Sequence, residues 1–179
     1  GDALGTFNNT LINSGTIVGN NGTAVQFGAG SDKLVLNSGF AFTGVVEGGA
    51  GDNTLEFASG DASLDLGTEF VDFDVVQVDS GATLSLGGAT TIASGFTFDN
   101  QGTLANTQTL TIDGVFTNSG PIDNTGTIVG GFANTGTLGN SGLITGNPYG
   151  VSGGGTITNS GTIHGTVAGV DFTAPGMLT

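Results

Sequence analysis

The stretch FTNSGPIDNTGTIVGGFANTGTLGNSGLITG, residues 116–146, decides the fold of this chain. In it an Asn is followed by Ser or Thr, then by Gly, and then by a short apolar run. Such units start at Asn13, Asn118, Asn124, Asn134, Asn140 and Asn159, with looser copies at Asn37, Asn100 and Asn106. A short unit that recurs along the chain is typical of repeat architectures.

The repeats come in pairs that recur at a period of about 16–19 residues. The step from Asn100 to Asn118, for example, is close to the step from Asn118 to Asn134. The unit is too rich in Gly and β-branched residues to favour helices. Its apolar residues form alternating runs, such as TLTID and GTIVG, that are typical of short strands. The N-x-G tripeptides between these runs tolerate positive φ and therefore favour tight corners.

Strands and corners at this period predict an all-β parallel β-helix (β-solenoid) of about 16–22 residues per coil. We expect nine or ten coils and a rod on the order of 45 Å long, because strands stack at roughly 4.8 Å. Equivalent residues of successive coils then lie on one another. Inward Ile, Leu, Val and Phe would form core ladders, and corner Asn residues would form ladders of amide hydrogen bonds. The candidate aromatic core residues include Phe57, Phe70, Phe73, Phe96 and Phe98.

The composition excludes several classes of function. The chain has 179 residues, a net charge of −14, a single Lys or Arg and no Cys. Nucleic-acid binding and attraction to an anionic membrane both need Lys and Arg, so neither partner is expected. No apolar run is long enough to span a membrane as a helix, so we expect no membrane insertion of this segment. The absence of Cys excludes disulfides and thiolate metal sites.

The middle of the chain is acidic. Its nine acids are Glu47, Asp52, Glu56, Asp61, Asp65, Glu69, Asp72, Asp74 and Asp79. In FVDFDVVQVD, residues 70–79, the alternation predicts that Asp72 and Asp74 point outward. The later shift of the apolar positions predicts a corner between Val75 and Val76. The acids form either a solvated face that keeps the rod soluble or an anionic site such as a calcium site.

Two segments resemble the calcium-binding nonapeptide repeat G-G-x-G-x-D-x-Φ-x. EGGAGDNTLEF matches it at Gly48, Gly49, Gly51 and Leu55, with Asn53 at the Asp position; FGAGSDKLVL matches it at Gly28, Gly30, Asp32 and Leu34, with Phe27 at the first Gly. In that family adjacent copies share each ion, whereas these two copies are separated and neither has a tandem partner. We therefore assign no metal ligand and no cofactor, and leave open whether ions bind near Asp32 and Asp52.

Three segments, INSGTIVG, VEGGAGDNTLEFASG and EFVDFDVVQVDSGATLSLGG, resemble the passenger regions of bacterial autotransporters (type V secretion) and related haemagglutinin-type adhesins. The resemblance implies a right-handed parallel β-helix at the extracellular surface of a Gram-negative bacterium. It implies adhesion, aggregation or a spacer role. The membrane barrel of that family has no counterpart in the sequence. We therefore expect residues 1–179 to be a single β-helix domain, a fragment or processed segment of a longer exported protein.

The sequence favours a non-enzymatic structural or adhesive β-helix, either a surface stalk or an adhesin passenger segment. A polysaccharide-active β-helix enzyme is an alternative, but we assign no catalytic residue. Lys33 and His164 lie far apart and are expected on the surface, and NSG is a turn rather than a nucleophile elbow.

Two further alternatives concern surfaces of the rod. An ice-binding face would need a regular T-x-T pattern; Thr109–Thr111 is one instance, and the flanking coils do not repeat it in register. Neither terminus has the sequence of a cap, so head-to-tail stacking into a filament, a homo-polymer, is another alternative. Expected partners are a host or neighbouring-cell surface, a polysaccharide, or a second copy of the chain.

Overall fold

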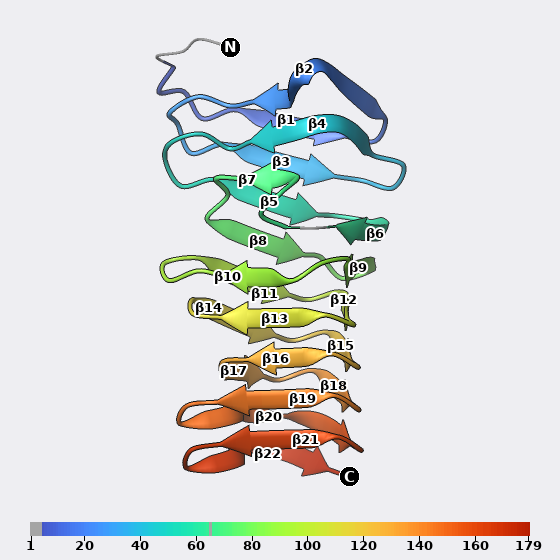
Figure 1. The fold of residues 1–179 in the computed structure, drawn as a ribbon, viewed down its shortest axis with the longest axis vertical. Coiled ribbons are helices and arrows are strands. Elements are labelled where there is room, and N and C mark those ends of the chain that lie inside the picture. Colours follow the sequence, from blue (N-terminus) through green and yellow to red (C-terminus); the bar gives the residue numbers. More distant parts are fainter. Residues whose placement is uncertain (1–4, 65) are drawn as a thin grey trace.

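The structure is a computed structural model that describes residues 5–64 and 66–179. Across these residues the chain forms no helix, and parallel strands stack into a β-solenoid of about eight turns. Figure 1 shows the coils stacked along one axis, with the described N-terminal and C-terminal coils at opposite ends of the rod. The predicted parallel β-solenoid is confirmed, with about eight turns in place of the nine or ten expected.

From residue 54 onward the strands form three faces, whereas each of the first two coils contributes only two strands. The first face contains β1 (Thr10–Asn13), β3 (Lys33–Leu36), β5 (Thr54–Phe57), β8 (Val75–Val78), β11 (Thr97–Asn100), β14 (Val115–Asn118) and β17 (Phe132–Asn134). The second face contains β6 (Gly60–Leu64), β9 (Ala82–Leu86), β12 (Thr103–Asn106), β15 (Pro121–Asn124) and β18 (Thr137–Asn140). The long strands β20 (Tyr149–Asn159) and β22 (Ala168–Leu178) pair with each other and extend over both of these faces.

The third face is divided into two sheets. Its N-terminal sheet contains β2 (Thr16–Gln26), β4 (Ala41–Glu47) and β7 (Phe70–Val71). Its C-terminal sheet contains β10 (Thr90–Ile92), β13 (Thr109–Ile112), β16 (Thr127–Val129), β19 (Leu143–Gly146) and β21 (Thr162–Gly165).

The coils are wide near the N-terminus and short near the C-terminus. On the first face Thr10 pairs with Lys33, so the first coil is slightly longer than the predicted range. The coils remain wide as far as Thr97, which pairs with Val75. Beyond Thr97 each coil is shorter, as between Thr117 and Ala133, and the coil length falls within the period of the Asn repeats.

The core consists of stacked apolar side chains, as predicted. On the second face one column contains Leu84, Leu104, Ile122, Leu138 and Ile157, all buried. On the first face the rings of Phe98, Phe116 and Phe132 stack with centroids 5.3 and 5.0 Å apart. Of the other aromatic candidates, Phe57, Phe70 and Phe73 are buried and Phe96 is half-buried.

The predicted amide ladders are present in the short coils. On the first face Asn100 Nδ2 donates to Asn118 Oδ1, and Asn118 Nδ2 donates to Asn134 Oδ1, both at 2.7 Å. On the second face a parallel ladder contains Asn106, Asn124, Asn140 and Asn159, and each of its steps is also 2.7 Å. These side chains are buried at strand ends, apart from the half-buried last rung, so the opening repeat encodes an internal hydrogen-bond network.

The same Asn side chains also close their own corners. Asn118 Nδ2 donates to the carbonyl oxygen of Gly120, two residues later, at 2.8 Å. A Cβ built on Gly120 would lie 2.1 Å from the carbonyl oxygen of Gly102 in the preceding coil. The Gly of the Asn-x-Gly units in the short coils is therefore required for close stacking, whereas a Cβ on Gly15, in the first coil, would meet nothing within 4 Å.

The ladder prediction is wrong for Asn13 and for Asn37, whose Oδ1 accepts the hydroxyl of Ser59 at 3.3 Å rather than an amide N–H. Asn13 shares its column with Leu36, so no amide lies on it, and its buried Nδ2 has no partner in the described structure. The predicted corner between Val75 and Val76 is also wrong, because both residues belong to the continuous strand β8. The chain turns earlier, at residues 72–74, where Asp72 has a φ of 60°.

Candidate functional site

A lateral cleft lies where wide coils meet short ones, and we call it the junction cleft. It has a volume of about 320 Å³. Its lining includes residues 71–74 and 90–93 together with Leu66, Gly67, Val76, Phe96, Thr97 and Phe98. The cleft separates the two sheets of the third face, because within the described residues β7 pairs with β4 and β10 pairs with β13, but β7 does not pair with β10.

The cleft combines aromatic and acidic groups. Phe73 and Phe98 are buried in its wall, and Asp72 is exposed at its edge. Asp72 adopts a left-handed backbone conformation that few residues other than Gly, Asn and Asp accept. The carboxylate of Asp74 is half-buried, and its Oδ2 accepts the backbone N–H of Asn53 at 2.8 Å. Such a surface suits a neutral or cationic ligand with an apolar face.

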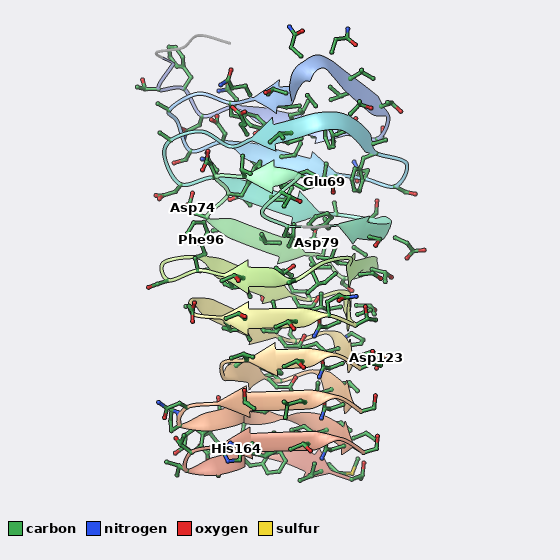
Figure 2. The ribbon with its side chains drawn as sticks, in the orientation of Figure 1. Glu69, Asp74, Asp79, Phe96, Asp123 and His164 are labelled. Atoms are coloured by element: carbon green, nitrogen blue, oxygen red, sulfur yellow. The ribbon has the colours of Figure 1, made fainter. Side chains whose placement is uncertain are left out.

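The two candidate basic residues do not reach this cleft. Lys33, on β3, has a side chain that is 43% exposed, as predicted, and it forms an ion pair with Glu56 on β5. His164 is exposed on β21, as predicted. Figure 2 shows His164 near the C-terminal end of the rod and Asp74 well above it. Neither residue is therefore placed to assist proton transfer at the cleft carboxylates.

The acids of the middle segment are spread over several coils. Asp52, Asp61, Glu69 and Asp72 are exposed, whereas Glu47, Glu56, Asp74 and Asp79 are half-buried; Asp65 lies outside the described residues. Glu47 accepts hydrogen bonds from Thr23 and Gln26, and Asp79 accepts one from Gln77. No group of three or more His, Cys, Asp or Glu side chains gathers in the described part of the chain.

A column of Asn and Asp residues precedes the first-face strands of the wide coils, and sequence reasoning did not identify it as a column. It contains Asn9, Asp32, Asn53 and Asp74, each one residue before its strand. A side-chain oxygen of Asp32 accepts the N–H of Asn9, an oxygen of Asn53 accepts the N–H of Asp32, and an oxygen of Asp74 accepts the N–H of Asn53. A recurrence of Asx residues at one coil length would have been the sequence signal.

The third face carries Thr residues in partial register. Thr109 pairs with Thr127 and Thr111 pairs with Thr91, but Val129 follows Thr111 in the next coil. Each flanking coil therefore retains only part of the T-x-T pattern.

Comparisons with known proteins assign no family and no function to this chain. The described residues contain no helix that is long and apolar enough to cross a membrane. The chain matches no protein-family model, no curated protein and no solved structure.

Proposed function

We propose that this chain is a non-enzymatic extracellular β-solenoid that serves as a surface stalk or as an adhesin passenger segment. The observation that carries the proposal is the axial stacking of the described coils, whose first-face strands pair in parallel register without interruption from β1 to β20. Internal ladders of Asn, Leu and Phe fix that register. Such a rod projects about 40 Å at the usual strand spacing.

The sides of the rod support this function. The net charge of −14 favours solubility and opposes lateral association of rods. The junction cleft offers aromatic and carboxylate groups to a ligand on a host or neighbouring-cell surface, including a polysaccharide. The resemblance of the repeats to autotransporter passengers supports display at the surface of a Gram-negative bacterium.

The test is to treat intact source cells with an external protease and to measure the intact mass of the native polypeptide. A stalk or passenger segment is degraded without cell lysis and belongs to a polypeptide well above 17.4 kDa. Protection in intact cells, with digestion only after lysis, would contradict the proposal. A cytoplasmic protein of the same cells serves as the control for lysis.

A head-to-tail filament is a second candidate, favoured by the last coil. Leu178 pairs with Ile157 and continues the same core column, yet Leu178 is 50% exposed whereas Ile157 is 1% exposed. Phe172 and Met177 on the same strand are also exposed. A further coil would bury Leu178, and either a second copy of the chain or a continuation of the same polypeptide can provide one.

Sedimentation velocity of the 179-residue chain over a range of concentrations tests the filament. End-to-end assembly gives larger species at high concentration, and Leu178→Asp abolishes them because it places a charge on the stacking surface. Ser119→Asp, at an exposed position on the side of the rod, is the matched control and should assemble normally. A monomer at every concentration would contradict the filament while leaving the stalk proposal intact.

A further inference from the structure

The second face begins with a strand that is unpaired on one edge. In the third coil, β5 pairs with β3 and β7 pairs with β4 of the preceding coil. By contrast, β6 pairs only with β9 of the following coil in the part of the chain that the structure describes. No further backbone hydrogen bond joins residues 61–63 to the described residues. An unpaired edge carries free N–H and C=O groups and is a template for another strand.

The paths of the coils explain this free edge. In the second coil residues 37–40 lead directly from β3 to β4, whereas in the third coil the connection from β5 to β7 includes β6. The third coil therefore extends beyond the second, and Figure 1 shows β6 above β9 at the side of the rod. Ser38 lies against the start of β6, since a Cβ built on Gly60 would lie 2.8 Å from the Cβ of Ser38. Residues 61–63 form an open shelf, which we call the β6 ledge.

A groove with aromatic walls lies on the β6 ledge. Its volume is about 350 Å³, and its lining includes Phe40, Phe42 and Phe70 beside Ala62. The first two rings are half-buried, and the ring centroids of Phe42 and Phe70 are 5.8 Å apart. Ala62 pairs in register with Leu84 and therefore begins the apolar column of the second face. An apolar side chain placed above Ala62 would extend this column by one position and contact the Phe rings.

Two carboxylates flank the groove. Asp61 on β6 and Glu69, directly before β7, are exposed and belong to its lining. Figure 2 shows Glu69 beside β7. The chain's single Lys, Lys33, pairs with Glu56, and neither groove carboxylate takes part in a salt bridge within the described residues. The groove therefore offers an apolar surface, a free strand edge and two negative charges that the chain does not neutralise.

We propose that the β6 ledge binds an extended, cationic peptide segment of a partner protein by strand addition. The segment pairs with the free edge of β6, so that backbone hydrogen bonds hold it in place. Side chains alternate along a strand, and the exposures of Asp61, Ala62 and Ser63 show that only the middle one points inward. The segment therefore places an apolar side chain over Ala62 and a Lys or Arg side chain over Asp61.

Charge complementarity favours this occupant over a second copy of the chain. A second copy carries the same net charge of −14, so it would bring further acids to Asp61 and Glu69. A basic segment instead meets both carboxylates, and the negative field of the rod increases its rate of encounter. Binding at this ledge requires neither a stalk nor a filament, because the groove lies on the side of the rod.

The test uses the 179-residue chain and the probe acetyl-Lys-Leu-Lys-Leu-Lys-amide, followed by calorimetry and by amide hydrogen exchange. We expect binding that weakens as salt is added, and slower exchange of one or more amides at residues 61–63. The matched probe acetyl-Glu-Leu-Glu-Leu-Glu-amide should not bind, because it places acids over Asp61. Asp61→Asn and Glu69→Gln should each weaken binding of the Lys probe about two- to fivefold, the usual effect of one exposed charge pair.

A double variant with an equal change of net charge is the control. Asp52→Asn with Asp123→Asn removes two exposed carboxylates outside the groove, so it should keep the wild-type affinity. The proposal is overturned if the Lys probe does not bind at millimolar concentration, or if this control weakens binding as much as Asp61→Asn with Glu69→Gln. It is also overturned if binding leaves the exchange at residues 61–63 unchanged. Protection of these amides in a concentrated solution of the chain alone would assign the ledge to a second copy and would overturn it as well.

Discussion

Replacement of Asn124 by Ala tests whether the amide ladders stabilise the rod. Asn124 is fully buried in the middle of the second-face ladder. Its Oδ1 accepts Asn106 Nδ2, and its Nδ2 donates to Asn140 Oδ1, both at 2.7 Å. Asn124→Ala therefore removes the donor for Asn140 Oδ1, whereas Asn106 Nδ2 keeps the carbonyl of Thr127 at 3.1 Å.

The magnitude follows from these contacts. An orphaned buried acceptor costs about 1–3 kcal/mol, and the second lost hydrogen bond adds about 1 kcal/mol. We therefore expect Asn124→Ala to lower the free energy of unfolding by about 3 kcal/mol. Asn159, the last rung, is half-buried, and without it Asn140 Nδ2 still reaches the carbonyls of Gly142 and Thr162. Asn159→Ala should cost only about 1 kcal/mol.

Unfolding in guanidinium chloride, followed by circular dichroism, measures both losses. Thr125→Ala, at the exposed position beside Asn124, is the control and should change the free energy of unfolding by less than about 0.5 kcal/mol. Equal losses for Asn124→Ala and Asn159→Ala would refute the reasoning, since burial and remaining partners then would not decide the cost. A loss below about 1 kcal/mol for Asn124→Ala would show that the ladder contributes little to stability.

Substitutions at three further positions test the stacking of the coils by the same unfolding measurement. A Cβ on Gly142 would lie 2.0 Å from the carbonyl oxygen of Gly126, so we expect Gly142→Ala to cost about 2–3 kcal/mol. On Gly139 the nearest atom would lie 3.7 Å away, so Gly139→Ala should be nearly neutral; a similar loss for both would contradict the close-approach argument. Phe116 is 3% exposed and stacks between two other Phe rings, so Phe116→Ala should cost about 3–5 kcal/mol and Phe116→Leu clearly less. Equal costs for these two variants would argue against a filled aromatic column.

The regular part of the fold could be read from the spacing of the Asn-x-Gly units. In the C-terminal half most first-face and second-face strands end in an Asn-x-Gly unit, so the spacing of these units reports directly which residues stack. The spacing alone therefore predicts that Asn100, Asn118 and Asn134 form one amide ladder. The all-β class and the Phe and Leu columns follow from the same periodicity.

The candidate sites could not be recognised from the sequence, because recognising them requires the strand-pairing register of the wide coils. The sequence singled out both Asp32 and Asn53, but only the tertiary structure shows that each immediately precedes one of two paired strands. It also shows that Asn53 Nδ2 donates to backbone carbonyls, whereas Asp32 Oδ2 has no partner among the described residues. The junction cleft was not predicted, because it arises where two sheets of the third face fail to pair.

By itself, then, the sequence determined a parallel solenoid with amide ladders, because a short repeat with β-branched strands and Gly corners has few other ways to bury its apolar residues. The tertiary structure decided where the ladders begin. Asn100 follows Val78 in its column, so its Oδ1 has no donor from the preceding coil, and Asn13 lies on Leu36. The physical reason is that longer loops separate the strands of the wide coils, so only the pairing register shows that Leu36, Phe57 and Val78 occupy the column that Asn takes in the short coils.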